Sequence, residues 1–159
     1  MPATMDYAIL PYSPAFAPAF DRLNRAWIEA YFSVEPLDDA VLTDPQRYIL
    51  DPGGELWFAV ENGHVLGCCA LLKQEDGAYE FTKLGVDEAA RGKGVARALL
   101  RHCTARARAL GAPALRIFTS TKLVPANTLY RSEGFPVVAM SAAQKARYKR
   151  GDILYELAL

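Results

Sequence analysis

The residues best placed to do chemistry lie where an apolar run gives way to a helical pattern: Arg91, Gly92, Lys93, Gly94, Val95 and Ala96. Glycine has no Cβ, so a ligand can approach the main chain closely at such a position. The first turn of a helix has N–H groups without intrahelical partners, and the helix dipole adds partial positive charge. We therefore expect this segment to bind a phosphate group, preferably a diphosphate.

Three phosphate-binding motifs compete for this segment. A P-loop needs GxxxxGK followed by Ser or Thr, and the order of residues here is different. A dinucleotide fingerprint needs GxGxxG, but Arg97 stands at the third glycine position and the preceding pattern is an antiparallel meander. The pattern [Q/R]-x-x-G-x-[G/A] is satisfied by Arg91, Gly94 and Ala96. The plain alternative is a glycine turn that only joins two elements.

Three strand-like runs lead into this segment, at residues 55–62, 64–74 and 78–86. The dipeptides Asn62-Gly63 and Asp76-Gly77 separate them, and such pairs are typical of tight hairpin turns. These runs predict an antiparallel meander. A helix is predicted directly after it, because apolar residues from Ala96 to Leu110 recur at helical spacing.

The remaining elements alternate in type along the chain. Helical patterns are expected within 13–32, 36–50 and 125–135, and strands at 5–12, 114–120, 136–140 and 152–159, the last two as a closing hairpin. This order predicts a mixed sheet with helices on both faces. With 159 residues and no linker or repeat, residues 1–159 are expected to form one domain.

Composition argues against several classes of function. Eighteen basic residues balance eighteen acidic ones, which argues against a nucleic-acid partner. The three cysteines have no framework or metal-ligand spacing, so we expect reduced, mostly buried thiols and no metal site. No signal peptide and no run long enough to span a membrane is apparent, so we expect a cytoplasmic protein without membrane contact.

The segments "RGKGVA", "YEFTKLGVDEAARGKG" and "LYRSEGF", in this order, resemble the GNAT superfamily of acyl-CoA-dependent N-acyltransferases. The resemblance covers nearly the whole chain. It implies an α/β (α+β) fold whose mixed, mostly antiparallel sheet of six to seven strands is flanked by helices on both faces. The sheet would be splayed between its fourth and fifth strands.

The resemblance implies acetyl-CoA as cosubstrate, lying where the sheet splays. The amides of residues 91–96 would hold its pyrophosphate, and its pantetheine would pair with the strand edge at Leu84, Gly85 and Val86. An N–H at Leu84 or Val86 would polarise the thioester carbonyl. Gly85 suits a β-bulge at this point.

Two side chains are candidates for proton transfer in direct attack of an amine on the thioester. Glu80 is the candidate base, and strand alternation places it on one face with Thr82, Leu84 and Val86. Its alternative role is a solvated or ion-paired strand residue. Tyr130 lies four positions before Gly134, where the resemblance suggests a tyrosine near the coenzyme sulfur; the alternative is aromatic packing.

One departure from the family pattern concerns a coenzyme-contacting asparagine. The corresponding position here is Leu123, and Asn127 lies one helical turn later. Asn127 is therefore either a cofactor contact or a helix-surface amide.

The acceptor pocket is the least determined part of the sequence. Trp27, Tyr31 and Glu35 recur at helical spacing and could line it, although such a stripe also suits a core. Tyr148 and Arg150 could reach in from the closing hairpin, and Arg150 could hold a substrate carboxylate or lie in a solvated turn.

The predicted function is an N-acetyltransferase acting on a small-molecule or peptide amine, as a monomer or homodimer. The alternative is a non-catalytic acyl-CoA-binding or regulatory module with the same fold. The presence of both Glu80 and Tyr130 favours the enzyme.

Overall fold

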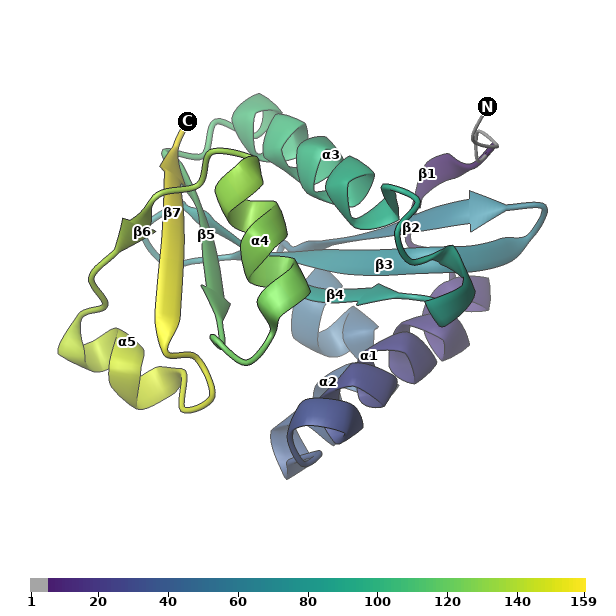
Figure 1. The fold of residues 1–159 in the computed structure, drawn as a ribbon, viewed down its shortest axis with the longest axis horizontal. Helices are drawn as coiled ribbons and strands as arrows, with labels where there is room; N and C mark the ends of the chain where they lie inside the picture. The colour runs from purple at the N-terminus through teal and green to yellow at the C-terminus, as the bar shows by residue number, and fades with distance from the viewer. Residues whose placement is uncertain (1–5) are drawn as a thin grey trace.

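The chain folds around a single seven-stranded sheet (Figure 1), seen in a computed structural model that describes residues 6–159. The strands are β1 (Ala8–Pro11), β2 (Glu55–Glu61), β3 (His64–Lys73), β4 (Tyr79–Val86), β5 (Ala114–Thr119), β6 (Val137–Val138) and β7 (Ile153–Ala158). Their order in the sheet is β1-β2-β3-β4-β5-β7-β6. All neighbouring strands are antiparallel except β4 and β5, which are parallel.

Helices cover both faces of this sheet, as predicted. The α-helices are α1 (Ala17–Tyr31), α2 (Pro36–Thr43), α3 (Val95–Ala109), α4 (Val124–Ser132) and α5 (Ala142–Arg147). Short helical turns lie at η1 (Pro14–Phe16), η2 (Gln46–Leu50) and η3 (Glu88–Ala90). One hydrophobic cluster joins the sheet to α3 and α4, and a second joins the opposite face to α1, α2 and the π-helical turn η2.

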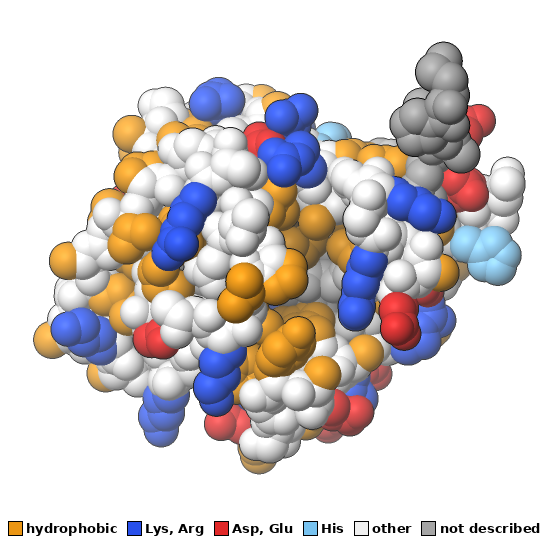
Figure 2. Space-filling view, viewed as in Figure 1, with side chains coloured by type: hydrophobic (Ala, Val, Ile, Leu, Met, Phe, Trp, Pro, Cys, Tyr) orange, Lys and Arg blue, Asp and Glu red, His pale blue; other side chains and the backbone are white. Residues whose placement is uncertain are grey.

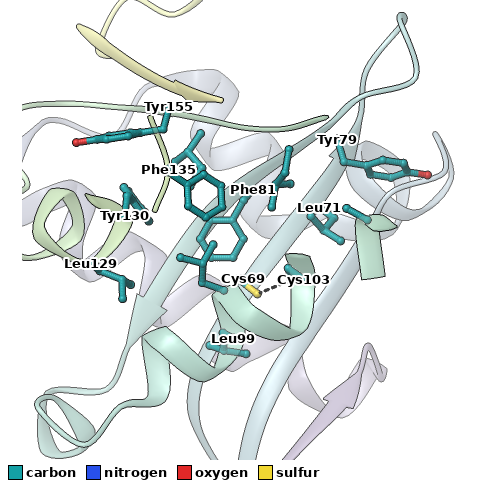
Figure 3. Close-up of a cluster of buried hydrophobic side chains, with 14 of the residues drawn as sticks. Cys69, Leu71, Tyr79, Phe81, Leu99, Cys103, Leu129, Tyr130, Phe135 and Tyr155 are labelled. Atoms are coloured by element: carbon teal, nitrogen blue, oxygen red, sulfur yellow. Dashed lines mark hydrogen bonds between the residues drawn. The ribbon is translucent and has the colours of Figure 1, made fainter. Parts of the chain in front are cut away.

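Strand alternation divides the core between the two faces. Cys69 belongs to the α3 cluster, and its Sγ lies 3.4 Å from Cys103 Sγ (Figure 3). Cys68 instead packs in the α1 cluster. Neighbouring strand residues point to opposite faces, which explains why the adjacent cysteines lie in different clusters. All three cysteines are buried and free.

The β2–β3 hairpin confirms its predicted turn. Asn62 and Gly63 both have positive φ, at 48° and 78°, which is the conformation that an Asn-Gly hairpin turn requires.

The parallel pair β4–β5 is the interruption in the sheet. The strands pair only at Tyr79–Leu115 and Glu80–Arg116, near the start of each strand. Both strands continue beyond this point without pairing to one another. The predicted splay between the fourth and fifth strands is therefore confirmed, and a gap opens toward the carboxyl ends of both strands.

The closing hairpin differs from its prediction. Strands β6 and β7 do pair, but β6 is short and helix α5 lies between them. The overlooked signal is a capping box: Ser141 Oγ accepts from the Gln144 amide, and Gln144 Oε1 accepts from the Ser141 amide.

Within residues 6–159, no helix is long and apolar enough to cross a membrane. The same described part of the chain holds no cluster of three or more potential metal-ligating side chains.

Candidate active site

A cleft of about 590 Å³ occupies the gap between β4 and β5 (Figure 2). The space-filling view shows a hollow in this face with an apolar interior and basic side chains around its rim. Its walls include most of the predicted coenzyme-binding residues: Leu84, Gly85, Val86, Arg91, Gly92, Gly94, Val95, Ala96 and Tyr130. Lys93 and Asn127 are not among the residues that line it.

The glycine segment forms the end of the cleft where α3 begins. Gly92 and Gly94 have φ of 76° and 81°, a region that favours glycine. A Cβ built on either would have no heavy atom within 4 Å, so both positions face open space. Gly94 is the N-cap residue of α3, so the first-turn amides of this helix adjoin the cleft. The loop therefore has the form that an anion site needs.

A β-bulge lies in β4, two positions before its predicted place. Cys68 pairs with Gly85 and Ala70 with Thr82, so Lys83 and Leu84 together oppose a single residue of β3. Lys83 has φ of 56°, in the left-handed region. A bulge of this kind bends the strand and redirects its side chains.

The bulge overturns the predicted common face of β4. Phe81, Leu84 and Val86 all pack with the α3 cluster, so the alternation changes phase at Lys83. Glu80 and Thr82 therefore share a face with each other but not with Leu84 and Val86. A regular strand was assumed, and the extra residue invalidates that assumption.

Gly85 serves a different purpose from the predicted bulge. A Cβ at this position would lie 3.1 Å from backbone and side-chain atoms of Leu23 in α1. The absence of a side chain thus allows α1 to pack closely against β4, beside the cleft.

Glu80 lines a second cavity of about 480 Å³. It is 4% exposed, and its Oε1 accepts hydrogen bonds from Tyr148 Oη at 2.5 Å and from Gln74 Nε2 at 3.1 Å. Burial raises the pKa of the Glu80 carboxyl, while the hydrogen bond from Tyr148 opposes this increase. A carboxylate with a raised pKa is a stronger base than an exposed one.

Helix α5 places Tyr148 against Glu80. Tyr148 is the C-cap residue of α5, and its ring stacks on Phe118 of β5 with centroids 3.8 Å apart and planes 5° apart. The phenol and the carboxylate thus come from segments far apart in the sequence. Sequence reasoning named Tyr148 as a pocket residue but did not predict its contact with Glu80.

The two cavities meet at the end of the β4–β5 gap. Both are lined by Trp27, Thr82, Lys83, Phe118, Thr119 and Leu123. We call the first space the cleft. We call the second the acceptor cavity, because it contains Tyr148 and Arg150 of the predicted acceptor pocket. Molecules bound in the two spaces would meet at the shared residues.

Tyr130 lies in the wall of the cleft and in the α3 cluster (Figure 3). Its ring makes edge contacts with Phe81 and Tyr155, with centroids 6.3 and 5.5 Å apart. Burial raises the pKa of Tyr130 well above its ordinary value, so the phenol keeps its proton at neutral pH.

Asn127 is occupied by contacts within the protein. Its Nδ2 donates to the carbonyls of Ser120 and Leu123 at 2.9 and 2.8 Å, and its Oδ1 accepts from Tyr155 Oη at 2.7 Å. These bonds tie α4 to the loop after β5 and to β7. They support a structural role, and its contact with the coenzyme stays a prediction.

An ion pair between Arg150 and Asp38 lies in the wall of the acceptor cavity. Arg150 donates to both oxygens of Asp38, and its Nη2 also donates to the Ser33 carbonyl at 3.0 Å. Asp38 additionally accepts from the Glu35 amide at 2.8 Å. Burial opposes ionisation of Asp38, but the contacts with Arg150, the Glu35 amide and the Lys83 charge together outweigh it and lower the pKa of this carboxyl.

The cysteines are unsuited to nucleophilic catalysis. Burial raises the pKa of the Cys68 thiol to about 12, so almost no thiolate is present at neutral pH. Neither Cys69 nor Cys103 lines the cleft or the acceptor cavity.

Comparison with known proteins agrees with this geometry. The model of the acetyltransferase (GNAT) family matches residues 19–135, which is more than half of the chain. The chain belongs to the GNAT family. This GNAT protein is 36% identical to human N-acetylaspartate synthetase over 115 residues, which cover 72% of the chain and 36% of the human protein. The chain thus spans about a third of the length of the curated relatives that it matches first.

Solved structures share the fold over nearly the whole of this GNAT chain. A GNAT-family acetyltransferase from Staphylococcus aureus superposes with a TM-score of 0.86 at 16% identity, covering 97% of this chain and 99% of that protein. N-acetylglutamate synthase from Neisseria gonorrhoeae, complexed with coenzyme A and N-acetyl-glutamate, gives a TM-score of 0.73 at 17% identity, covering 99% and 36% of the two chains.

Proposed function

We propose that this protein is an N-acetyltransferase that transfers acetyl from acetyl-CoA to the amine of a small molecule. The observation that carries the proposal is the junction of two cavities, one ending at a glycine-lined helix start and the other containing a buried carboxylate. Family membership and the coenzyme-bound Neisseria structure support the choice of cosubstrate.

The cleft fits the proposed cosubstrate. Gly92 and Gly94 would hold the diphosphate, because their open positions let phosphate oxygens reach the main chain. Arg91 lines the same end and would add positive charge, whereas Arg97 at this end is paired with Glu133. The unpaired part of β4 offers backbone groups to an extended pantetheine chain. Acetyl-CoA supplies the activated acyl group, as a thioester.

Glu80 would prepare the acceptor by removing a proton from its ammonium. Only a neutral amine has the lone pair needed to attack a carbonyl. The carboxylate is buried in the wall of the acceptor cavity. Thr82, two residues further along the same strand, lines both this cavity and the cleft. Gln74 and Tyr148 hold one carboxylate oxygen, which fixes the orientation of the group.

Stabilisation of the leaving thiolate and polarisation of the carbonyl would come from the cleft wall. Tyr130 stays protonated, so its hydroxyl would donate a hydrogen bond to the departing thiolate. A backbone N–H of Leu84 or Val86 would stabilise negative charge on the carbonyl oxygen. The side chains of these residues face the α3 cluster, but this role needs only their backbone N–H groups.

The acceptor is proposed to be a small molecule because the acceptor cavity has a volume of about 480 Å³. The names of the human relative and of the Neisseria structure refer to acetylated amino acids, which supports the same class. A peptide amine remains an alternative for the test below.

The test combines binding and turnover. Acetyl-CoA should raise the melting temperature far more than NAD or ATP at equal concentration. Thiol release should then depend on an added amine in a panel of amino acids, polyamines and short peptides. Binding without amine-dependent release from any panel member would favour the non-catalytic acyl-CoA-binding module. A melting shift with NAD alone would refute the cosubstrate.

A further inference from the structure

Lys83 has a backbone conformation that lysine disfavours. Among residues 6–159, Asn62 and Lys83 are the two non-glycine residues with positive φ. Asn62 lies in a hairpin turn that demands this conformation, but Lys83 lies within a strand. A side chain in the left-handed region clashes with its own backbone, so such strain persists only where surrounding contacts hold it.

The consequence of this conformation is the direction of the side chain. On a regular strand Lys83 would alternate with Thr82 and point with Phe81 toward α3. The bulge instead brings Lys83 into the walls of both the cleft and the acceptor cavity. A cation therefore lies at the junction where transfer would occur, on the same side of the sheet as Glu80.

The Lys83 ammonium has a weak partner. Its Nζ lies 3.9 Å from Asp38 Oδ1, beyond hydrogen-bond distance, and its side chain is 18% exposed. Asp38 is already occupied, because both of its oxygens accept from Arg150. Burial lowers the pKa of Lys83 more than the carboxylate of Asp38 raises it. An additional anion beside Lys83 would offset the free-energy cost of burying its charged ammonium.

Arg150, one candidate for binding a substrate carboxylate, is less available than Lys83. Its guanidinium is committed to Asp38 and to the Ser33 carbonyl. The acceptor cavity nevertheless has an excess of positive charge, with four basic side chains against three acidic ones: Lys83, Arg147, Lys149 and Arg150 against Glu35, Asp38 and Glu80.

We propose that the acceptor carries a carboxylate close to its amine, and that Lys83 binds this carboxylate and so determines acceptor specificity. This inference rests on the proposed function. Lys83 and Glu80 face one cavity from the same strand, so an acceptor with its amine at Glu80 places a nearby carboxylate at Lys83. An α- or β-amino acid meets this requirement, whereas a polyamine would bring a second cation to Lys83.

The first test compares charged and neutral forms of the same acceptor. Each standard α-amino acid and its α-amide is assayed with acetyl-CoA by thiol release. The best amino acid should exceed its amide in kcat/KM by about 10- to 100-fold, the range of a charge-assisted hydrogen bond. Lys83→Gln should raise KM for the acid, leave KM for acetyl-CoA within about twofold, and abolish the preference. Lys83→Arg should restore part of it.

The second test requires no turnover. Binding of the same acids and amides is measured by calorimetry with the full chain saturated with coenzyme A. An acid should bind about 10-fold or more tightly than its amide, and Lys83→Gln should remove the difference. Lys145→Gln is the matched control, because this exposed lysine of α5 lines neither cavity.

The outcomes separate this inference from the proposed function. Equal use and equal binding of acids and amides, or better use of polyamines, would overturn the role of Lys83 while the acetyltransferase stands. A preference that survives Lys83→Gln in a folded variant would also overturn it. Absence of coenzyme A binding would instead refute the proposed function.

Discussion

The cleft and the acceptor cavity are built in different ways. Much of the cleft wall comes from one stretch of chain around the end of β4 and the start of α3, which includes Gly85, Gly92 and Gly94. The acceptor cavity draws side chains from α1, α2, β4, β5 and the segment after α5. In the proposed function, backbone groups of the cleft would bind the cosubstrate, whereas separate side chains of the cavity would select the acceptor.

Of the substitutions that test this difference, Gly94→Trp should have the largest effect, and that effect should be confined to ligand binding in the cleft. The indole would fill the space that faces Gly94, and a non-glycine residue at φ of 81° adds strain. We expect loss of detectable coenzyme A binding in calorimetry. Gly111→Trp is the matched control, because Gly111 has φ of 77° and open space at the other end of α3. Equal loss in both variants would contradict a local role for the loop.

Glu80→Gln should separate chemistry from coenzyme binding. The amide keeps the size of the side chain but cannot accept a proton, so kcat should fall by about 100-fold or more. Coenzyme A affinity should change little, because Glu80 lines the acceptor cavity and not the cleft. Glu75→Gln, in an exposed turn, serves as the control. Unchanged kcat across the pH range would remove Glu80 as the base.

Asp38→Asn should test how far the acceptor cavity depends on its ion pair. The substitution leaves the partly buried Arg150 without a charged partner, which should cost about 2 kcal/mol of unfolding free energy, within the range for hydrogen bonds to charged groups. A chain of this length would melt about 6 °C lower. Asp39→Asn, whose side chain is 61% exposed, should cost less than about 0.5 kcal/mol.

The pH dependence of this effect has a defined sign. The folded-state pKa of Asp38 is depressed, so its stabilisation is present above its unfolded pKa of about 4 and is lost as pH falls through the lower folded value. The difference between wild type and Asp38→Asn, measured by denaturant unfolding, should therefore shrink below about pH 4. A difference that persists at lower pH would mean that packing, rather than charge, is responsible.

Tyr148→Phe should give the smallest effect. The phenol donates to ionised Glu80, so its removal should raise the pKa of the base. The acidic limb of the kcat/KM profile should move to higher pH, with about a 3- to 10-fold loss at neutral pH. Tyr12→Phe should leave the profile unchanged. A uniform loss at all pH values would indicate a packing role for the Phe118 stack instead.

The contrast between the cleft and the acceptor cavity also explains which features could be predicted from the sequence. The glycine loop, the hairpin turns and the order of elements depend on residues near one another in the chain, and the structure agrees with them apart from the overlooked helix α5. The splay and the site roles came from a family resemblance, not from the residues alone.

Long-range and irregular features escaped prediction. The phase change at Lys83 depends on an extra residue in one strand, which alternation cannot reveal. The Tyr148–Glu80 and Arg150–Asp38 contacts join residues 68 and 112 positions apart. The sequence left open whether Arg150 binds a substrate carboxylate or lies in a solvated turn, and it could not show that Arg150 would pair with Asp38.

The gap between β4 and β5 has a mechanical consequence. With two residue pairs joining these strands, the sheet consists of a four-stranded part and a three-stranded part that share few main-chain bonds. An extended ligand lying along the free edge of β4 would act as an eighth strand and reconnect them. Filling the gap should therefore slow amide exchange on both parts together, making the protein unfold more nearly as one unit.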